Sequence, residues 1–418
     1  MLSLSGDPAL IKAAGREPAI GACGRSRRVI YIQYTNPCGY PPLLHSSEIL
    51  ADGGWEVLFL GTQALGFETP NPPSHPRVRF QYLGYRDSSW KRRLQYPWFC
   101  LWCVLWALRW RPAWVYASDM ASCIPAVILN ALGARILYHE HDSPPGEGTV
   151  SAEPGWMRLL RRARRRAARV AAFCVIPNAN RAKNLRSQTG TSKEVKVVWN
   201  TPLRKEVSAP RRSCEGALKL LYHGSIVPAR MPTAVVRAIG RVRYPVVLRI
   251  AGYETLGASG YLAKLQGLAQ ELGIPRSLEF SGLLQRAELM EYCQSCDIGL
   301  AVLPQNSSDP NLADMFGASN KVFDYLACGL ALLISQTSGW EELTPYGLTC
   351  DPADPSSIAE ALEYFCEHPA AVRAMGERGR QRILEEWNYE RHFHPVVEWM
   401  EREGARRAAV PETREGLS

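Results

Sequence analysis

The sequence lacks the two fingerprints by which nucleotide-binding α/β proteins are most often recognised. The first apolar segment, Val29–Gln33, is followed by Tyr-Thr-Asn-Pro-Cys-Gly-Tyr (34–40) rather than by Gly-x-Gly-x-x-Gly, and no Gly-Lys-Ser or Gly-Lys-Thr loop occurs in the chain. The first absence argues against a dinucleotide-dependent dehydrogenase, and the second argues against a P-loop enzyme.

Segments that direct a chain into a membrane or out of the cell are also missing. Residues 1–28 contain no apolar core between a basic flank and a small-residue cleavage site, so a secretory signal is not expected. The unbroken apolar run 98–108 is shorter than the ~20 residues that cross a bilayer. The twelve cysteines are scattered, and the two Cys-x-x-Cys pairs lie far apart within apolar helical patterns. We therefore expect a cytoplasmic chain with free thiols and no zinc site.

Size and charge set the frame for what is present. The 418 residues, of which 46% are hydrophobic and 21% charged, suffice for two α/β domains with sizeable cores. The formal net charge of +9 favours anionic partners such as nucleotides, acidic lipids or nucleic acid. Charge alone does not choose among these partners.

Short apolar strands alternate with helical segments from residue 29 onward, which predicts parallel sheets with crossover helices. The predicted strands are 29–33, 55–60, 114–117, 134–139, 173–176, 195–198, 218–222, 246–251, 278–281, 298–303 and 331–334. A polar, Pro-, Ser- and Arg-rich stretch separates the two series. We therefore predict two doubly wound, Rossmann-like α/β domains that face a cleft, where ligands bind beyond the carboxyl ends of the strands.

The predicted boundaries follow from these patterns. They are a disordered start (1–28), an N-terminal domain (29–200), a linker (201–217), a C-terminal domain (218–386), a final helix (387–402) and a disordered tail (403–418).

The segment 318–329, Ala-Ser-Asn-Lys-Val-Phe-Asp-Tyr-Leu-Ala-Cys-Gly, places polar side chains at the front of a short helix. Ser319 and Asn320 are helix-capping residues, and the free N–H groups of a helix start attract anions, with the charge of Lys321 added. Asp324 shares a helix face with Lys321, and its carboxylate can accept hydrogen bonds from a ribose diol. The pattern favours a nucleotide; an ordinary amphipathic helix with an exposed Lys–Asp pair is the alternative.

Several segments of the second half, taken in order, resemble the family 4 (group 1) glycosyltransferases of the GT-B fold. Leu-Tyr-His-Gly-Ser-Ile-Val-Pro-Ala-Arg (221–230) resembles that family's strand, glycine and downstream cation. The other matching segments are 250–253, 278–283, 288–289, 296–300 and 318–329. The resemblance covers about residues 29–400. It implies that the final helix crosses back to the first domain, with a hinge near 386–388.

The resemblance also implies that residues 29–200 form the acceptor-side domain and that residues 218–386 form the nucleotide-sugar-binding domain, which holds the donor site. Arg230 and Lys321 would neutralise the donor diphosphate, Asp324 would hold the ribose, and backbone near Leu283 would pair with the base. Fixed cations stabilise the departing diphosphate, and the sequence lacks an Asp-x-Asp that would hold Mg²⁺, so we expect neither metal nor cofactor. The predicted donor-binding residues are Gly224, Arg230, Leu283, Asp314, Ser319, Asn320, Lys321 and Asp324.

Three positions depart from the family pattern. Ser225 stands where many members carry Arg, so one diphosphate cation is missing or comes from elsewhere. The Glu-x7-Glu pair is not intact, because Phe316 stands eight residues before Asp324, and Asp314 is the candidate sugar-contacting acid in a shifted register. Asp324 is one methylene shorter than the usual Glu, so a ribose contact needs a closer helix or a bridging water.

The first domain carries the predicted catalytic residue, His141. It lies in Tyr-His-Glu-His-Asp (138–142) at the end of a predicted strand and resembles the family's N-domain His followed by an acid. Such a His can donate a hydrogen bond to a sugar hydroxyl or help the acceptor lose its proton; a cluster that merely caps a loop is the alternative. Gly39 and Tyr40, after the first strand, are candidate loop contacts.

Two helical segments favour contact with an anionic membrane surface. Trp98, Trp102, Trp106 and Trp110 recur every four residues, although a core helix shows the same spacing. The segment 156–166 has many arginines and no acid, which suits anionic headgroups; solvated arginines are the alternative. It lacks the interleaved aromatics of nucleic-acid binding, so nucleic acid is not an expected partner. We expect peripheral association with the inner face of the membrane.

Together these features predict a metal-independent glycosyltransferase of the hexosyltransferase type. It would move a sugar from a nucleotide-sugar donor to a glycan or lipid-linked acceptor in bacterial surface glycan or polysaccharide synthesis, with retention of configuration as the resemblance implies. Two alternatives stay open: a nucleotide-sugar epimerase of the same architecture, and a scaffold that binds nucleotide-sugar without turnover.

Overall fold

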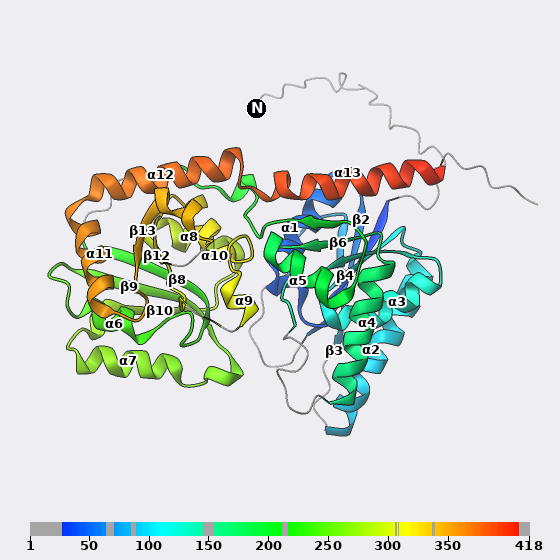
Figure 1. Ribbon diagram of the computed structural model, residues 1–418, viewed down its shortest axis with the longest axis horizontal. Helices are drawn as coiled ribbons and strands as arrows, with labels where there is room; N and C mark the ends of the chain where they lie inside the picture. The colour runs from blue at the N-terminus through cyan, green and yellow to red at the C-terminus, as the bar shows by residue number, and fades with distance from the viewer. Residues whose placement is uncertain are drawn as a thin grey trace, which may run out of the picture.

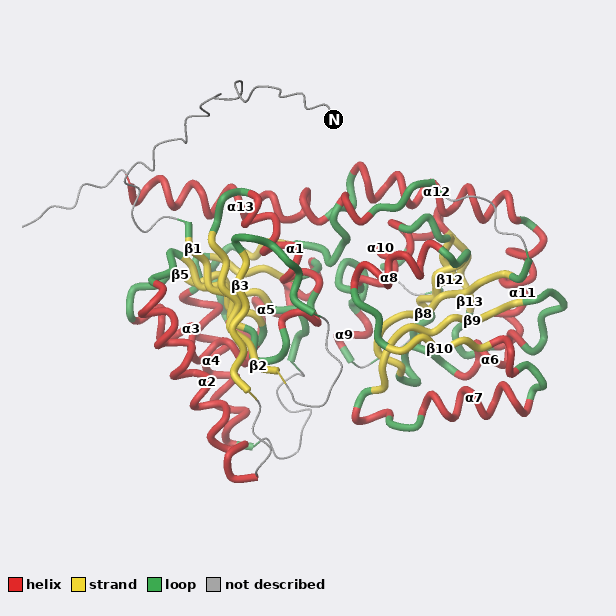
Figure 2. The backbone as a smooth tube through the Cα atoms, turned by 180° about the vertical axis from the view of Figure 1, so that it is seen from behind, coloured by secondary structure: helices red, strands yellow, loops and turns green. Residues whose placement is uncertain are grey.

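The computed structural model describes residues 27–63, 71–84, 89–144, 154–210, 216–305, 307, 309–336 and 339–408. Residues 1–26 and 409–418, parts of the predicted disordered ends, lie outside these ranges. Two parallel sheets, each covered by helices on both faces, build two domains that lie side by side (Figures 1 and 2). The predicted fold class is confirmed.

The first sheet has seven parallel strands in the order β3-β2-β1-β4-β5-β6-β7. They are β1 (Arg28–Ile32), β2 (Glu56–Gln63), β3 (Val78–Gly84), β4 (Trp114–Ser118), β5 (Arg135–His139), β6 (Phe173–Ile176) and β7 (Val195–Val197). The connecting helices are α1 (Pro41–Asp52), α2 (Ser89–Trp110), α3 (Cys123–Ala131), α4 (Gly155–Val170) and α5 (Ala179–Thr189).

The second sheet has six parallel strands in the order β10-β9-β8-β11-β12-β13. They are β8 (Leu218–Ile226), β9 (Val246–Glu254), β10 (Leu278–Gly282), β11 (Ile298–Ala301), β12 (Ala331–Ser335) and β13 (Gly347–Cys350). The helices are α6 (Thr233–Ile239), α7 (Tyr261–Glu271), α8 (Arg286–Gln294), α9 (Pro310–Ala313), α10 (Asn320–Ala327), α11 (Pro355–Glu367) and α12 (Pro369–Glu385).

Sequence patterns missed two strands, β3 and β13. Both lie at the edge of their sheet. β3 is only partly buried and mixes Arg and Gln with apolar residues, and β13 has four residues. A strand covered on both faces shows a continuous apolar run, and edge strands such as these do not.

The final helix, α13 (Tyr389–Ala408), packs on the first domain, whereas α12 before it packs on the second (Figure 1). Phe393, Val396 and Met400 are fully buried against the first sheet. The predicted helix end at residue 402 was wrong: Arg135 holds the next turn through both the carbonyl and the carboxylate of Glu403.

Three of the four tryptophans of the α2 stripe face inward, as the core-helix interpretation of their spacing expects, whereas Trp98 is exposed. Trp102, Trp106 and Trp110 are partly buried against the core of the first domain. The exposed apolar residues are Leu94, Trp98, Leu101, Leu105 and Leu108. Among the helices that the structure describes, none combines the length and apolar character that spanning a bilayer requires.

Candidate active site

The predicted site residues lie where the two sheets present the carboxyl ends of their strands to each other. Hydrogen bonds join the two sides directly. Asn178, which caps α5 in the first domain, donates to the carbonyl of Asp314 at 2.8 Å. Arg181 donates to the carbonyl of Asn311 at 2.9 Å. The site is therefore built from both domains.

Gly224 and Lys321 are in close contact at the end of β8. Gly224 has a φ of +103°, which favours glycine, and a Cβ at this position would lie 2.8 Å from Lys321 Nζ. The ammonium group also lies 5.6 Å from the centre of the Tyr222 ring. The glycine thus gives the Lys321 amine access to the end of the strand.

The surroundings of Lys321 disfavour its positive charge. Burial and the charge of Arg230 lower its pKa to about 7, while the charge of Asp324 acts in the opposite direction. The positive charges of Lys321 and Arg230 repel each other, and a negatively charged ligand that binds beside them stabilises both. A diphosphate satisfies this requirement.

Arg230 is held by Ser225, at the position where the resembled family carries a second cation. The guanidinium NH1 donates to Ser225 Oγ at 3.0 Å. The substitution therefore leaves Arg230 oriented by a hydroxyl rather than repelled by a neighbouring arginine.

The start of α10 differs from the predicted capped helix. Among the described residues, the Ser319 side chain makes no capping hydrogen bond, and Asn320 Oδ1 is buried without a hydrogen-bond partner. In the turn before the helix, the backbone N–H groups of Ala318 and Ser319 both donate to the carbonyl oxygen of Met315. A buried polar atom without a protein partner calls for a bound water, ion or ligand.

Asp324 does not form the exposed pair with Lys321 that the sequence allowed as an alternative. It is 1% exposed, and its two carboxylate oxygens accept hydrogen bonds from Arg286 at 2.7 and 2.8 Å. Sequence reasoning missed Arg286, although its place at the start of α8 was a signal. A cation at a helix N-terminus opposes the helix dipole, so such a residue needs a compensating partner.

Asp314 and Leu283 remain predictions. Asp314 lies at the contact between the domains, where its carboxylate accepts a hydrogen bond from Asn180 at 3.0 Å. Leu283 follows Gly282, whose φ is +72°, at the end of β10 and is half-buried. Both residues belong to the second domain, and only Asp314 contacts the first domain in these bonds.

On the first-domain side, His141 is buried at the end of β5. Its Nε2 lies 3.1 Å from Ser118 Oγ, and its ring lies 5.3 Å from the ring of Tyr40. Burial and the charge of Arg181 lower the pKa of His141 to about 3. A neutral imidazole of such low basicity is a weak proton acceptor, so the arrangement favours hydrogen bonding over general-base catalysis.

Asp119, which sequence reasoning missed, completes this side. It follows β4 with a φ of +60°, and its Oδ1 accepts a hydrogen bond from the backbone N–H of His141 at 2.9 Å. Burial raises its pKa to about 7, and the charges of Asp142 and Glu140 contribute in the same direction. A non-glycine residue in this conformation stores strain, which is often associated with function.

Tyr40 and Gly39 occupy the loop after β1. Burial, followed by the charge of Asp119, raises the pKa of Tyr40 to about 12. Gly39 is exposed, and a Cβ there would meet no atom within 4 Å. Tyr40 thus lies with His141 and Asp119, whereas Gly39 borders open space.

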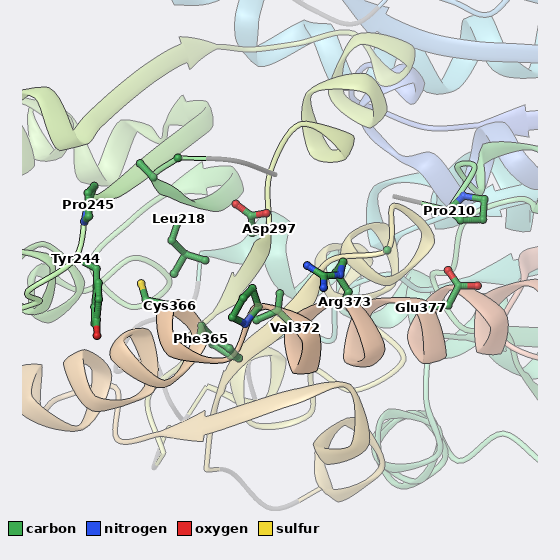
Figure 3. A pocket seen from close by; sticks show the side chains of 14 residues that line it. Pro210, Leu218, Tyr244, Pro245, Asp297, Phe365, Cys366, Val372, Arg373 and Glu377 are labelled. Carbon is green, nitrogen blue, oxygen red and sulfur yellow. The ribbon is translucent and has the colours of Figure 1, made fainter. Parts of the chain in front are cut away.

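A separate pocket of about 330 Å³ lies at the opposite, amino ends of the second sheet's strands (Figure 3). Leu218, Asp297 and Arg373 are among its lining residues, and no predicted donor-binding residue is. In the described ranges, no group of three His, Cys, Asp or Glu side chains could hold a metal ion. The expectation of a metal-free reaction stays a prediction.

Comparison with known proteins finds a family model that resembles the second half of the chain. Residues 233–398 match the model of a family described as glycosyl transferase-like. A GDP-mannose-dependent alpha-(1-6)-phosphatidylinositol monomannoside mannosyltransferase of Mycolicibacterium smegmatis is 25% identical over 39% of this chain and 42% of its own length. The corresponding monoacylated-substrate enzyme of Corynebacterium glutamicum is 26% identical over 32% of this chain and 35% of its own length. The chain thus spans less than half the length of these curated relatives.

Solved structures extend the similarity to both domains. A sucrose-phosphate synthase from Thermosynechococcus elongatus has a TM-score of 0.69 at 15% identity and covers 91% of this chain and 100% of its own. Anabaena HepE in complex with UDP and glucose has a TM-score of 0.67 at 13% identity, with 90% and 100% covered. At these identities the structures establish the fold alone. Together the comparisons show that the chain has the two-domain GT-B fold of these structures and that its second half is similar in sequence to glycosyl transferase-like proteins.

Proposed function

We propose that the chain transfers a sugar from a nucleotide-sugar donor to an acceptor, without a metal ion and with retention of configuration. The observation that carries this proposal is the pair of cations at the cleft, Lys321 with a pKa of about 7 beside Arg230. Cleaving the bond between sugar and diphosphate places negative charge on the leaving group. Two fixed cations and the open start of α10 stabilise that charge as it develops.

The donor base is open between two classes. The two curated relatives are named as GDP-mannose-dependent, and HepE was solved with UDP. We propose to measure thermal unfolding with GDP, UDP, ADP and dTDP and with GDP-mannose and UDP-glucose. A ligand at 100 times its Kd stabilises the folded chain by ~2.7 kcal/mol.

Lys321→Ala should abolish this stabilisation, and Lys264→Ala, at an exposed lysine of α7, should preserve it. No shift with any nucleotide in a folded sample would reject the donor site. Nucleotide release that requires an acceptor identifies a transferase. An altered sugar without acceptor would identify an epimerase, and binding without turnover would identify a scaffold.

We further propose that the acceptor is lipid-linked, that it serves surface glycan or polysaccharide synthesis, and that the chain docks on the inner face of an anionic membrane through α2, α3 and α4. These helices lie side by side on the face of the first sheet away from α1 and α13 (Figures 1 and 2), and α3 packs against both neighbours. The three helices contain eleven basic residues and no acidic residue. Their summed positive charge therefore exceeds the formal net charge of +9 of the whole chain.

The exposed side chains on this face combine apolar and basic character. Leu94, Leu101, Leu105 and Leu108 are each about half exposed in one stripe of α2 (57, 49, 50 and 55%). On α4, Trp156 and Leu159 are exposed beside Arg158, Arg162 and Arg166. Apolar side chains that enter the acyl region and arginines that meet anionic headgroups are the features of interfacial helices. A second copy on this face would bring arginine against arginine.

Vesicle sedimentation tests the docking face. The protein should bind vesicles that contain phosphatidylglycerol and not those of phosphatidylcholine alone, and salt should weaken binding. Leu101→Ser with Leu105→Ser should reduce binding at least tenfold, whereas Leu272→Ser, at an exposed leucine of the second domain, should not. Equal binding by both variants would reject this face. A concentration-dependent dimer that only the double variant loses would assign the face to a second copy.

A further inference from the structure

A chain of charged side chains runs from the donor side of the second domain to the first domain. The two terminal nitrogens of the Arg286 guanidinium donate to the carboxylate of Asp324. Its Nε donates to Glu206 Oε1 at 2.7 Å, and NH2 also lies 3.2 Å from Glu206 Oε2. Glu206 Oε2 in turn lies 3.1 Å from Nε2 of His45. Four side chains, His45, Glu206, Arg286 and Asp324, are thus joined by direct contacts.

Each member comes from a different part of the fold. Asp324 lies on α10 and Arg286 begins α8, both in the second domain, whereas Glu206 ends the short helix 204–206 in the segment between the domains. His45 lies on α1 of the first domain, and its Nδ1 lies 3.1 Å from the carbonyl oxygen of Thr201. The contacts therefore cross from one domain to the other through the connecting segment.

The network is strongly coupled because its members are shielded from water. Asp324 and His45 are buried, and the side chains of Glu206 and Arg286 are 13% and 24% exposed. Burial opposes ionisation of Glu206, but the charges of His45 and Arg286 hold its pKa well below the usual range. Without Arg286, two shielded carboxylates would face each other with no cation between them.

The Asp324 carboxylate keeps lone-pair sites that Arg286 does not use. A carboxylate has about four lone-pair sites; Arg286 occupies one on each oxygen, and His223 Nε2 lies 3.6 Å from Oδ2. The bidentate contact fixes the plane of the carboxylate, so the free sites have a fixed direction. A shorter Asp in place of the Glu of the resembled family makes this orientation important, because the side chain has less reach.

We propose that Arg286 is a positioning residue: it orients Asp324 toward the donor ribose, and through Glu206 and His45 it links donor binding to the placement of the first domain. This inference rests on the proposed function, since it requires a nucleotide donor. In this scheme Arg286 does not touch the donor. It affects donor affinity only through the hydrogen bonds that Asp324 accepts from the ribose hydroxyls.

The ribose hydroxyls provide a test that a merely structural role would not pass. The affinity of the bound nucleoside diphosphate is compared with that of its 2′-deoxy form by calorimetry. Wild type should prefer the ribonucleotide by roughly 10- to 100-fold, the range for a hydrogen bond to a charged group. Arg286→Lys should lose most of this preference yet retain deoxynucleotide affinity. Arg276→Lys, at an exposed arginine, is the control.

The outcomes separate the two proposals. If wild type binds no nucleotide, the proposed function fails. If wild type binds but Arg286→Lys keeps the full ribose preference, or loses both ligands equally while its unfolding temperature is unchanged, the positioning role is wrong.

The link to the first domain has its own readout. If donor binding moves the first domain, nucleotide should change the radius of gyration of wild type in X-ray scattering. Glu206→Gln keeps the size of the side chain but removes its charge, so it should preserve ribose preference and diminish that change. A scattering change identical to that of wild type would overturn the link.

Discussion

Lys321 Nζ lies where a side chain at Gly224 would begin. The hypothetical Cβ would be 2.8 Å from Nζ and 3.1 Å from Cε, and the φ of Gly224 is +103°. The two residues are 97 positions apart in the chain, yet the glycine is what allows the amine to reach the end of β8. Position 224 therefore affects both folding and donor binding.

Gly224→Ala should lower the free energy of unfolding by ~1–2 kcal/mol, because an L side chain is strained at positive φ. It should also weaken nucleotide binding, since the methyl group displaces the Lys321 amine. Denaturant titration and nucleotide affinity check the two effects. Gly267→Ala, in α7 with no atom near its Cβ, should instead raise stability by up to ~1 kcal/mol. Unchanged stability and affinity in Gly224→Ala would contradict the contact.

Donor affinity should depend on pH through Lys321. With a pKa of about 7, half of the amines are neutral at that pH, and binding a diphosphate requires the charged form. Affinity for the nucleotide-sugar should therefore fall above pH 7, toward tenfold per pH unit, with proton uptake measurable by calorimetry in two buffers. Lys321→Arg, always charged, should show a flat profile. A flat profile in wild type would show that the amine is protonated throughout.

The same group shapes stability in the opposite direction. The pKa of Lys321 in the folded chain lies below its model-peptide value of 10.5, so between about pH 7 and 10.5 the unfolded chain binds more protons at this site. Wild type should gain stability relative to Lys321→Met as pH rises through that window, in the absence of ligand. Paired denaturation curves at pH 7 and pH 9 measure this difference, and equal differences at both values would refute it.

The site residues that could be predicted from the sequence depend on local spacing, whereas those that were missed depend on contacts between separate elements. Lys321 and Asp324 share one helix, so their spacing alone placed them on one face. Arg286 lies 38 positions from Asp324, and only the packing of α8 beside α10 brings them together. Asp119 acquires its strain and its raised pKa from β4, β5 and their neighbours, none of which the local sequence records. Tertiary contacts therefore decided the parts of the site that were missed.

The strain at Asp119 can be separated from the role of its side chain. Asp119→Gly and Asp119→Ala both remove the carboxylate, but only glycine adopts a φ of +60° and a ψ of 173° without strain. Asp119→Gly should be more stable than Asp119→Ala by ~1–3 kcal/mol. Both variants should lose acceptor turnover while retaining nucleotide binding. Equal stability of the two variants would show that the backbone relaxes.

The arginines of α4 should divide into two classes on mutation. Arg164 pairs with Glu140 at 2.6 and 2.8 Å with both side chains almost fully buried, whereas Arg162 on the same helix is exposed. Arg164→Ala leaves a buried carboxylate without its partner and should cost ~3–5 kcal/mol. Arg162→Ala should change stability by less than ~0.5 kcal/mol. Denaturant unfolding distinguishes them, and vesicle binding should show the reverse order, because only the exposed arginine can meet a headgroup. Equal stability losses in the two variants would mean that the Arg164–Glu140 pair does not stabilise this helix.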